Sequence, residues 1–332
     1  MANELKLIQM SSVQSEEVRW LWYPYIPLGK LTIVQGDPGE GKTTLVLALI
    51  AALTRGDELP ECNSAEPPMT AIYQTAEDGL ADTIKPRLET MGADCSRVFV
   101  IDESRKELSM LDERLEIAIH ETEARLVVLD PVQAYLGSNV DMHRANEIRP
   151  ILKCVASLAE QNNCAVILIG RMNKAQGLKA SYRGLGSIDF RAAARSVLLV
   201  GRMKGDPSVR VMAQDKNSLA PEGRSMSFSL GENGFRWLGS CDATVDDVLC
   251  GMAHTETKTT QMENALRELL EDGDGFPSDE LTAYAESLGI SERTLKIAKR
   301  NVGVVSERRG RKWYSMLLPQ EGKGVPRHWL GG

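Results

Sequence analysis

Long apolar runs, paired cysteines and a leader-like start are all missing from this chain of 332 residues. No stretch approaches the ~20 apolar residues that a membrane-spanning helix needs, so we expect no membrane partner. The first residues hold no basic-then-apolar segment, and we therefore expect a cytoplasmic protein rather than a secreted one. The six cysteines form no Cys-x-x-Cys pair, which is typical of reduced thiols and not of a disulfide framework or a metal site.

The composition is that of an ordinary globular protein. Hydrophobic residues make up 42% and charged residues 26%, which excludes wholesale disorder and fibrous architecture. At ~150 residues per domain, the length predicts two domains, or one large domain with an appendage. No internal repeat is visible.

Charge is distributed unevenly along the chain, whose net charge is −7. Residues 171–224 carry eleven Lys and Arg against four Asp and Glu, and residues 291–332 carry ten against three. Residues 251–290 are acidic, with two basic against nine acidic side chains. Local patches decide the binding of polyanions because screening limits each charge to a Debye length of ~8 Å. The basic segments are therefore either nucleic-acid contacts or simply solvated faces.

Strand and helix patterns alternate over the first 245 residues. Strand patterns occupy 31–36, 70–75, 98–102, 125–130, 164–170, 194–202, 209–216, 225–230 and 235–239. Helical patterns begin at Thr43 and cover 80–91, 111–124 and 145–162. This alternation predicts an α/β fold with a doubly wound, mostly parallel sheet flanked by helices, and the late run of strands predicts an antiparallel edge.

The chain changes character after about residue 245. Helical patterns cover 261–270, a segment that Ser278 can cap and Gly289 ends, and a segment that Ser291 can cap. Two short strands follow within 304–317. Three helices and a hairpin are typical of a winged helix-turn-helix. We therefore expect domains at 1–245 and 246–318 and a flexible tail at 319–332.

An aromatic lead-in precedes the first strand of the sheet. It contains Trp20, Trp22, Tyr23 and Tyr25 together with two prolines. We expect these rings to pack or to dock a subunit, and base stacking is the alternative.

A glycine-rich loop carries the strongest signal for chemistry. GDPGEGKT matches the pattern GxxxxGK[ST] and lies between a hydrophobic strand and a helix. The glycines let backbone N–H groups surround phosphate oxygens, the lysine reaches the β- and γ-phosphates, and the threonine hydroxyl ligates Mg²⁺. We expect the cofactors ATP and Mg²⁺, and the nucleotide-binding residues Gly36, Asp37, Pro38, Gly39, Glu40, Gly41, Lys42, Thr43 and Thr44. A purely structural glycine turn is the alternative.

Carboxylates follow two other predicted strands. Asp130 ends the strand LVVLD, where it can hold Mg²⁺ together with Thr43. Glu77 and Asp78 follow the strand AIYQTA, which we expect near the phosphate-loop strand. A carboxylate there can orient and deprotonate the attacking water, and Glu77 is favoured because it leaves the strand first. Asp78 suits a helix N-terminus better.

Cations follow the later strands. Arg171 comes after the strand CAVILI, where a polar group can sense the γ-phosphate, and the loop behind it is basic and glycine-rich. Such a loop can bind a DNA backbone or remain merely solvated; its candidates are Lys174, Lys179 and Arg183. Ring-forming ATPases also insert a cation from a neighbouring subunit, and by position alone four residues are candidates for this or for solvated charge: Arg195, Arg202, Arg210 and Lys216.

The C-terminal segment concentrates positive charge on one predicted helix and on the hairpin after it. A recognition helix with a basic wing suits major-groove insertion and backbone contact, whereas protein contact is the alternative. The DNA-binding candidates are Arg293, Lys296, Arg300 and Arg309, supported by Lys299, Arg308, Arg311, Lys312, Trp313 and Tyr314.

Together these motifs resemble the RecA-like P-loop ATPases of the RepA hexameric helicase group, which is common on plasmids and phages. The resemblance covers about residues 15–240 and rests on GDPGEGKTT, QTAED, VVLDPVQAYLG, the NK of GRMNK, RGLGSIDFRAAARS and DKNSLAPEG. It implies a homo-oligomer, expected to be a hexamer, with single-stranded DNA in a central channel lined by 136–147 and 174–186.

The resemblance also assigns roles within the nucleotide site. It implies Glu77 as catalytic base, Lys42 and Thr43 at the phosphates and Mg²⁺, Asp130 on the metal, and Arg195 as a finger that reaches a neighbour's nucleotide, with Lys216 close to the same interface. One residue departs from the pattern, because the group usually has His where Arg171 stands. That substitution keeps a donor but adds fixed charge, which affects the coupling between nucleotide state and DNA loop.

Two functions follow as expectations. The first is a Mg-ATP-dependent, ring-forming DNA ATPase, namely a replicative helicase of a mobile element. The alternative is an ATP-switched DNA-binding initiator, recombination mediator or regulator that does not unwind DNA, and the Arg171 departure favours it. A small-molecule P-loop kinase is weaker, because no acceptor site is evident and the basic segments would be unexplained.

Overall fold

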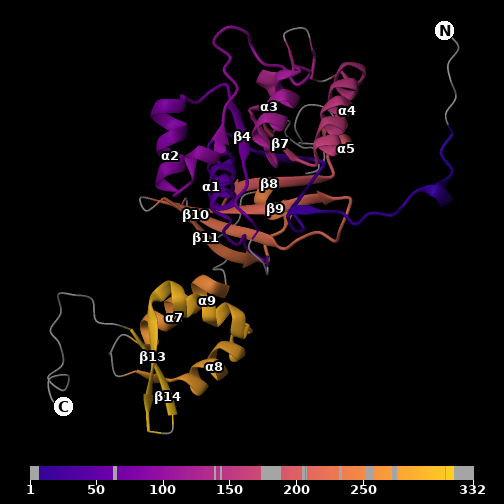
Figure 1. Ribbon diagram of the computed structural model, residues 1–332. Coiled ribbons are helices and arrows are strands. Elements are labelled where there is room, and N and C mark those ends of the chain that lie inside the picture. The colour runs from indigo at the N-terminus through magenta and orange to yellow at the C-terminus, as the bar shows by residue number, and fades with distance from the viewer. Residues whose placement is uncertain are drawn as a thin grey trace, which may run out of the picture.

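One mixed sheet of nine strands organises the first 241 residues of the computed structural model (Figure 1). Its strand order is β11-β10-β9-β8-β3-β7-β6-β4-β5. The structure describes residues 7–62, 66–137, 140–142, 144–172, 188–203, 206, 208–231, 234–250, 258–270, 275–310 and 312–317.

Five parallel strands form the centre of this sheet and are almost completely buried, as expected for strands that helices cover on both faces. They are β3 (Leu31–Gly36), β4 (Ala71–Thr75), β6 (Leu126–Asp130), β7 (Ala165–Arg171) and β8 (Ser196–Arg202), and a sixth parallel strand, β5 (Val98–Phe99), forms one edge of the sheet and ends in the exposed Phe99. The antiparallel edge that the sequence predicted is present and consists of β9 (Val209–Asn217), β10 (Ser225–Gly231) and β11 (Gly234–Cys241). The parallel strands place their carboxyl ends at one edge of the sheet, where α/β folds bind ligands.

Helices cover both faces of the sheet. On one face α1 (Lys42–Arg55) and α2 (Lys85–Thr90) bury residues such as Leu49 and Leu88 against the strands. On the other face lie α3 (Arg114–Thr122), α4 (Ala145–Asn162) and the short α5 (Ile188–Ala193). A further short helix, α6 (Val245–Cys250), packs Val248 against β8 and β9.

The aromatic lead-in is part of the core. It forms a small ribbon of β1 (Trp20–Trp22) and β2 (Ile26–Pro27), and Trp22 and Tyr25 are each only 1% exposed. The Trp22 ring meets Trp237 of β11 at 5.5 Å between centroids. Packing is therefore confirmed for these two rings, whereas Tyr23 is exposed. Residues 7–19 run away from the sheet as an exposed arm (Figure 1).

The C-terminal elements enclose a hydrophobic cluster of their own, built on residues such as Leu266, Leu281 and Leu295. The elements are α7 (Lys258–Leu269), β12 (Phe276–Pro277), α8 (Ser278–Ser287), α9 (Glu292–Val302), β13 (Val304–Arg309) and β14 (Lys312–Leu317). The three strands pair in the order β12-β14-β13. The division at residue 245 stays a prediction; α6 packs on the large sheet, and the separate cluster begins with α7.

Several local predictions were wrong in detail. Ser278 is not a cap, since it is the first residue of α8 and its Oγ lies 2.9 Å from Ser315 Oγ. The predicted helix over 80–91 begins with a π-helical turn at Leu80–Ile84 before α2. β5 ends at Phe99, although a strand was expected over 98–102. By contrast, the Ser291 cap is confirmed, because its Oγ accepts from the Thr294 N–H at 3.2 Å.

Candidate nucleotide-binding site

The glycine-rich loop turns between β3 and α1 at the carboxyl edge of the sheet. Gly36 ends β3 so close to β8 that a Cβ there would lie 2.1 Å from the Val200 carbonyl oxygen. Gly39 and Gly41 have φ of +79° and +92°, in the left-handed region where glycine is favoured. The first N–H groups of α1 therefore open toward this loop, as in phosphate-binding loops.

Lys42 is the first residue of α1, and it is 8% exposed. Its Nζ donates to the carbonyl oxygens of Gly36 at 2.9 Å and of Asp37 at 2.8 Å. Burial lowers the pKa of Lys42, the Asp130 carboxylate opposes this shift, and the positive charge of Arg171 adds to it. An anion in the loop would replace weak carbonyl partners with a full charge.

Thr43 and Asp130 meet as the sequence predicted. Thr43 Oγ1 donates to Asp130 Oδ2 at 2.7 Å, and Tyr73 OH donates to the same oxygen at 2.9 Å. Burial raises the pKa of Asp130, while these two hydrogen bonds oppose the shift. The Tyr73 contact was not predicted, because it depends on β4 pairing with β6, which no local pattern reveals.

This pair of oxygens fits Mg²⁺. Hydroxyl and carboxylate oxygens are the hard ligands that Mg²⁺ prefers, and in nucleotide sites the ion usually takes one or two side chains and completes its shell with phosphate and water. Within the described ranges, no group of three or more His, Cys, Asp or Glu is arranged to hold a metal. A cation beside Asp130 would also favour its ionised form, which burial disfavours.

Two of the late-strand cations lie beside the chain's own phosphate loop. Arg202 ends β8 and donates through Nη2 to the Gly39 carbonyl oxygen at 3.3 Å, and its Nε lies 3.7 Å from Glu40 Oε1. Arg210, its partner on β9, is 6% exposed and lies beside Gly41. Burial lowers the pKa of Arg210, and the charge of Arg202 adds to the effect. The reason is topological: β8 pairs directly with β3.

Glu77 reaches the same edge by a less direct route than expected. The strand before it, β4, is separated from β3 by β7 and β6. The Glu77 carboxylate nevertheless contacts Arg171 at the end of β7, with Arg171 Nη2 at 2.5 Å from Glu77 Oε1 and 2.8 Å from Oε2. Asp78 instead pairs with Arg87 of α2 at 3.3 Å, which agrees with a place near a helix N-terminus.

Arg195 and Lys216 lie at the opposite edge of the sheet. The N–H of Arg195 donates to the carbonyl of Leu31 at the start of β3, and the Arg195 side chain is exposed. Lys216 Nζ donates to the carbonyl oxygens of Arg191 and Ala194 at the end of α5, at 2.7 Å and 2.8 Å. Burial lowers the pKa of Lys216, as do the charges of Arg191 and Arg195. Neither residue can contact the nucleotide of its own chain.

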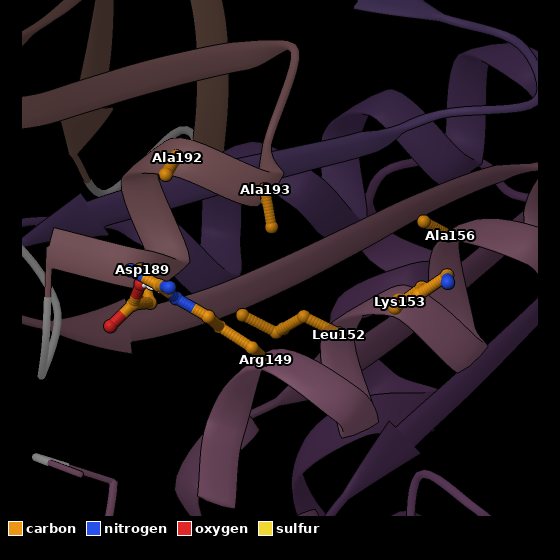
Figure 2. Close-up of a pocket in the computed structure, with 7 residues that line it drawn as sticks. All are labelled: Arg149, Leu152, Lys153, Ala156, Asp189, Ala192 and Ala193. Atoms are coloured by element: carbon orange, nitrogen blue, oxygen red, sulfur yellow. Dashed lines mark hydrogen bonds and ion pairs between the residues drawn. The ribbon is translucent and has the colours of Figure 1, made fainter. Parts of the chain in front are cut away.

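A groove of about 310 Å³ lies between α4 and α5 (Figure 2). Arg149 of α4 donates through Nε to Asp189 Oδ1 of α5 at 2.5 Å, and Asp189 is 4% exposed. Arg191 also pairs with Asp215 of β9. Six residues are too few for a stable isolated helix, so α5 depends on the ion pairs of Asp189 and Arg191 and on the hydrogen bonds from Lys216. Arg195 follows shortly after α5, so the same contacts help to fix its position.

The basic candidates of the C-terminal region share one face of α9. Arg293, Lys296 and Arg300 are exposed, while Leu295 and Ala298 between them are buried. Two further basic side chains of this region already contact other groups of the chain. Lys299 donates to Ser315 Oγ at 3.0 Å, and Arg309 donates to Glu307 at 2.9 Å while its guanidinium lies 5.4 Å from the centre of the Tyr314 ring.

Some predicted residues fall outside the described ranges. These are Lys174, Lys179 and Arg183 of the expected DNA loop, Arg311 of the hairpin and the tail at 319–332. None of the described helices is long and apolar enough to cross a membrane.

Comparison with known proteins assigns the chain to a family. A family model described as "AAA domain" matches residues 3–177, which is more than half of the chain and includes the loop, Glu77, Asp130 and Arg171. The chain belongs to the AAA domain family. The AAA domain model ends before β8, so Arg195, Arg202 and the C-terminal helices lie beyond it.

Curated relatives of this AAA domain chain include DNA repair proteins RadA. That of Halalkalibacterium halodurans is 27% identical over 149 residues, 44% of this chain and 28% of the relative. That of Haemophilus influenzae is 24% identical over 231 residues, 69% of this chain and 44% of the relative. The match thus spans less than half the length of these relatives. The crystal structure of the RadB recombinase aligns at 20% identity and a TM-score of 0.45, covering 64% of this chain and 91% of that one.

Proposed function

We propose that the chain is a Mg²⁺-dependent ATPase that binds DNA in a nucleotide-dependent manner, as a recombination or repair factor of the RecA-like type. The observation that carries this proposal is the meeting of Lys42, Thr43 and Asp130 at the glycine-rich loop. A small-molecule kinase would need the same loop, but it leaves the basic face of α9 unexplained.

The residues divide the hydrolysis between them. Backbone N–H groups of the loop and Lys42 bind the phosphates, and Thr43 and Asp130 hold the metal. Mg²⁺, when bound, would neutralise phosphate charge as the bond to the leaving group breaks. Glu77 orients the attacking water and accepts its proton. Arg195, at the edge far from its own loop, serves the nucleotide of a neighbouring copy, which requires head-to-tail assembly such as a hexameric ring.

DNA binding rests on two independent supports. The curated relatives named above are DNA repair proteins. The order α7, β12, α8, α9, β13, β14 is also that of a winged helix-turn-helix, in which α9 would be the recognition helix and the β13–β14 hairpin the wing. We propose that this region binds duplex DNA and that the ATPase domain binds single strands.

The relatives favour an ATP-switched recombination factor over a replicative helicase of a mobile element. A helicase function remains the second candidate because this chain shares motifs with the RepA group. A forked-duplex unwinding assay separates the two: we expect nucleotide-dependent binding without strand separation. Robust ATP-driven unwinding would establish the helicase instead.

The ATPase itself is tested by nucleotide binding and turnover with and without single-stranded DNA. We expect Lys42→Ala to abolish turnover and to weaken triphosphate binding strongly, because it removes the buried ammonium. Lys85→Ala is a matched control, since Lys85 is an exposed lysine of α2 that pairs only weakly with Glu89 at 3.6 Å. If wild-type protein neither binds nor hydrolyses ATP, the proposal is wrong. Mass measurement with a non-hydrolysable triphosphate tests the assembly.

A further inference from the structure

Glu77, the candidate catalytic base, already accepts hydrogen bonds from another side chain in the structure. Both oxygens of Glu77 accept from a single nitrogen of Arg171, Nη2, at 2.5 Å and 2.8 Å. A guanidinium has only donors and keeps its charge in proteins, so it cannot take a proton from water on behalf of Glu77. While the pair persists, a water molecule must compete with a charge-assisted hydrogen bond for the carboxylate.

The pair lies across the mouth of the nucleotide site. Arg171 ends β7 and Glu77 follows β4, while β6 lies between these strands and ends in Asp130. On its other side β7 pairs with β3, where Arg171 stands opposite Gly36 of the phosphate loop. The charge of Arg171 also reaches Lys42, whose pKa it helps to lower. Arg171 thus has a carboxylate on one side and the phosphate loop on the other.

Arg171 can also readily exchange Glu77 for another acceptor. Its side chains are 54% and 55% exposed, and ion pairs in contact with water are weak. A triphosphate beside Lys42 brings several negative charges to the other side of Arg171. The guanidinium can exchange one carboxylate for a phosphate oxygen at little cost, because both are acceptors of the same kind.

We propose that the Arg171–Glu77 ion pair is a nucleotide-sensitive latch: it withholds Glu77 from water until the terminal phosphate of a bound triphosphate draws Arg171 away. The latch rests on the proposed ATPase function. A diphosphate lacks the terminal phosphate and leaves the Arg171–Glu77 pair intact. Only triphosphate binding therefore has to break the pair, so the preference for triphosphate over diphosphate is smaller than the contacts with the terminal phosphate alone would give.

The test is a double-mutant cycle on binding, read with a non-hydrolysable triphosphate and with diphosphate. Removing the charge of Glu77 frees Arg171, so Glu77→Gln should tighten triphosphate binding by about two- to fivefold, the strength of an exposed ion pair, and leave diphosphate unchanged. In an Arg171→Gln background the same change should have no effect on triphosphate. Asp78→Asn is the matched control, because Asp78 is the next carboxylate and pairs with Arg87 instead.

Other outcomes overturn the latch. Equal tightening in both backgrounds would mean that Glu77 simply repels the phosphates, and no tightening in either would mean that the pair is never exchanged. A crystal structure with bound triphosphate that keeps the pair intact would overturn it without any variant. If wild-type protein binds neither nucleotide, the proposed ATPase function fails rather than the latch alone.

Discussion

Gly36 shows how strictly a single residue position constrains the site. It ends β3 against the backbone of β8, and a Cβ there would lie 2.1 Å from the Val200 carbonyl oxygen. Because backbone atoms cannot move aside as a flexible side chain can, β3 and β8 would have to separate. We therefore expect Gly36→Ala to lower the free energy of unfolding by ~1–3 kcal/mol or more, measured by chemical denaturation.

Gly231 provides the control for this prediction. It ends β10, and a Cβ there would meet nothing within 4 Å. Gly231→Ala should therefore change stability by no more than about 0.5 kcal/mol. Equal stability of the two variants would show that the approach of β3 to β8 is not close in solution.

The burial of Lys42 predicts that the protein takes up protons when it binds nucleotide. Burial lowers its pKa in the nucleotide-free chain, so part of the population is neutral at alkaline pH. In that window the unfolded chain binds more protons than the folded one, and stability rises with pH. Phosphate favours the ammonium form and opposes the shift, so triphosphate binding should take up protons in the pH window where the lowered pKa leaves Lys42 partly neutral.

Calorimetry in two buffers of different ionisation enthalpy measures this uptake. Lys42→Arg should eliminate it, because a guanidinium stays charged throughout the range, whereas Lys85→Ala should keep it. Uptake that persists in Lys42→Arg would assign the proton to another group.

Residue-level prediction from the sequence succeeded for residues that lie in recognisable motifs. Thr43 and Asp130 were expected to meet, and they do. Tyr73 was missed, and Arg202 was considered only as a cation for a neighbour or as solvated charge. Their contacts depend on which strands pair, since β4 pairs with β6 and β8 with β3.

At the scale of elements, strands and long helices followed their hydrophobic patterns, while short elements did not. α4 spans Ala145–Asn162 as predicted, because its periodic apolar face is long. α5 was missed, because its six residues are held by distant partners such as Arg149 and Lys216 rather than by their own pattern. Strand β12 was missed for the same reason: it has two residues and exists through pairing with β14.

The exposed basic face of α9 carries the prediction for DNA. Removing one cation that binds a phosphate should reduce the slope of log affinity against log salt by about one unit. The triple variant Arg293→Ala, Lys296→Ala and Arg300→Ala should therefore bind duplex DNA more weakly and with a slope smaller by up to about three. Fluorescence anisotropy titrations at several salt concentrations measure both quantities.

Arg267 is the control for this element, since it is an exposed arginine of α7 that lies outside α9. Arg267→Ala should leave affinity and slope unchanged. If the triple variant also binds DNA like wild type, the face of α9 contacts protein rather than DNA, which is the alternative function of this region.

For the whole molecule, the separation of hydrophobic clusters matters most. The two largest clusters lie on opposite faces of the large sheet, while the cluster of α7, α8 and α9 is separate from both. Units with separate cores unfold as separate cooperative transitions unless a large interface couples them. The nucleotide site lies wholly within the sheet unit, since its loop, Asp130 and Arg171 all follow or end strands of that sheet.

Scanning calorimetry of the full chain should therefore show two transitions, and Mg²⁺ with a non-hydrolysable triphosphate should raise only one of them. At about 100 times the dissociation constant, ligand adds about 2.7 kcal/mol to the unit that binds it. For a unit of this size that corresponds to a shift of roughly 5–10 °C. Lys42→Ala should show the same two transitions and no shift. A single transition that moves as a whole would mean that the packing of α7 against β11 couples the units, and nucleotide binding would then be felt directly by the proposed DNA-binding face of α9.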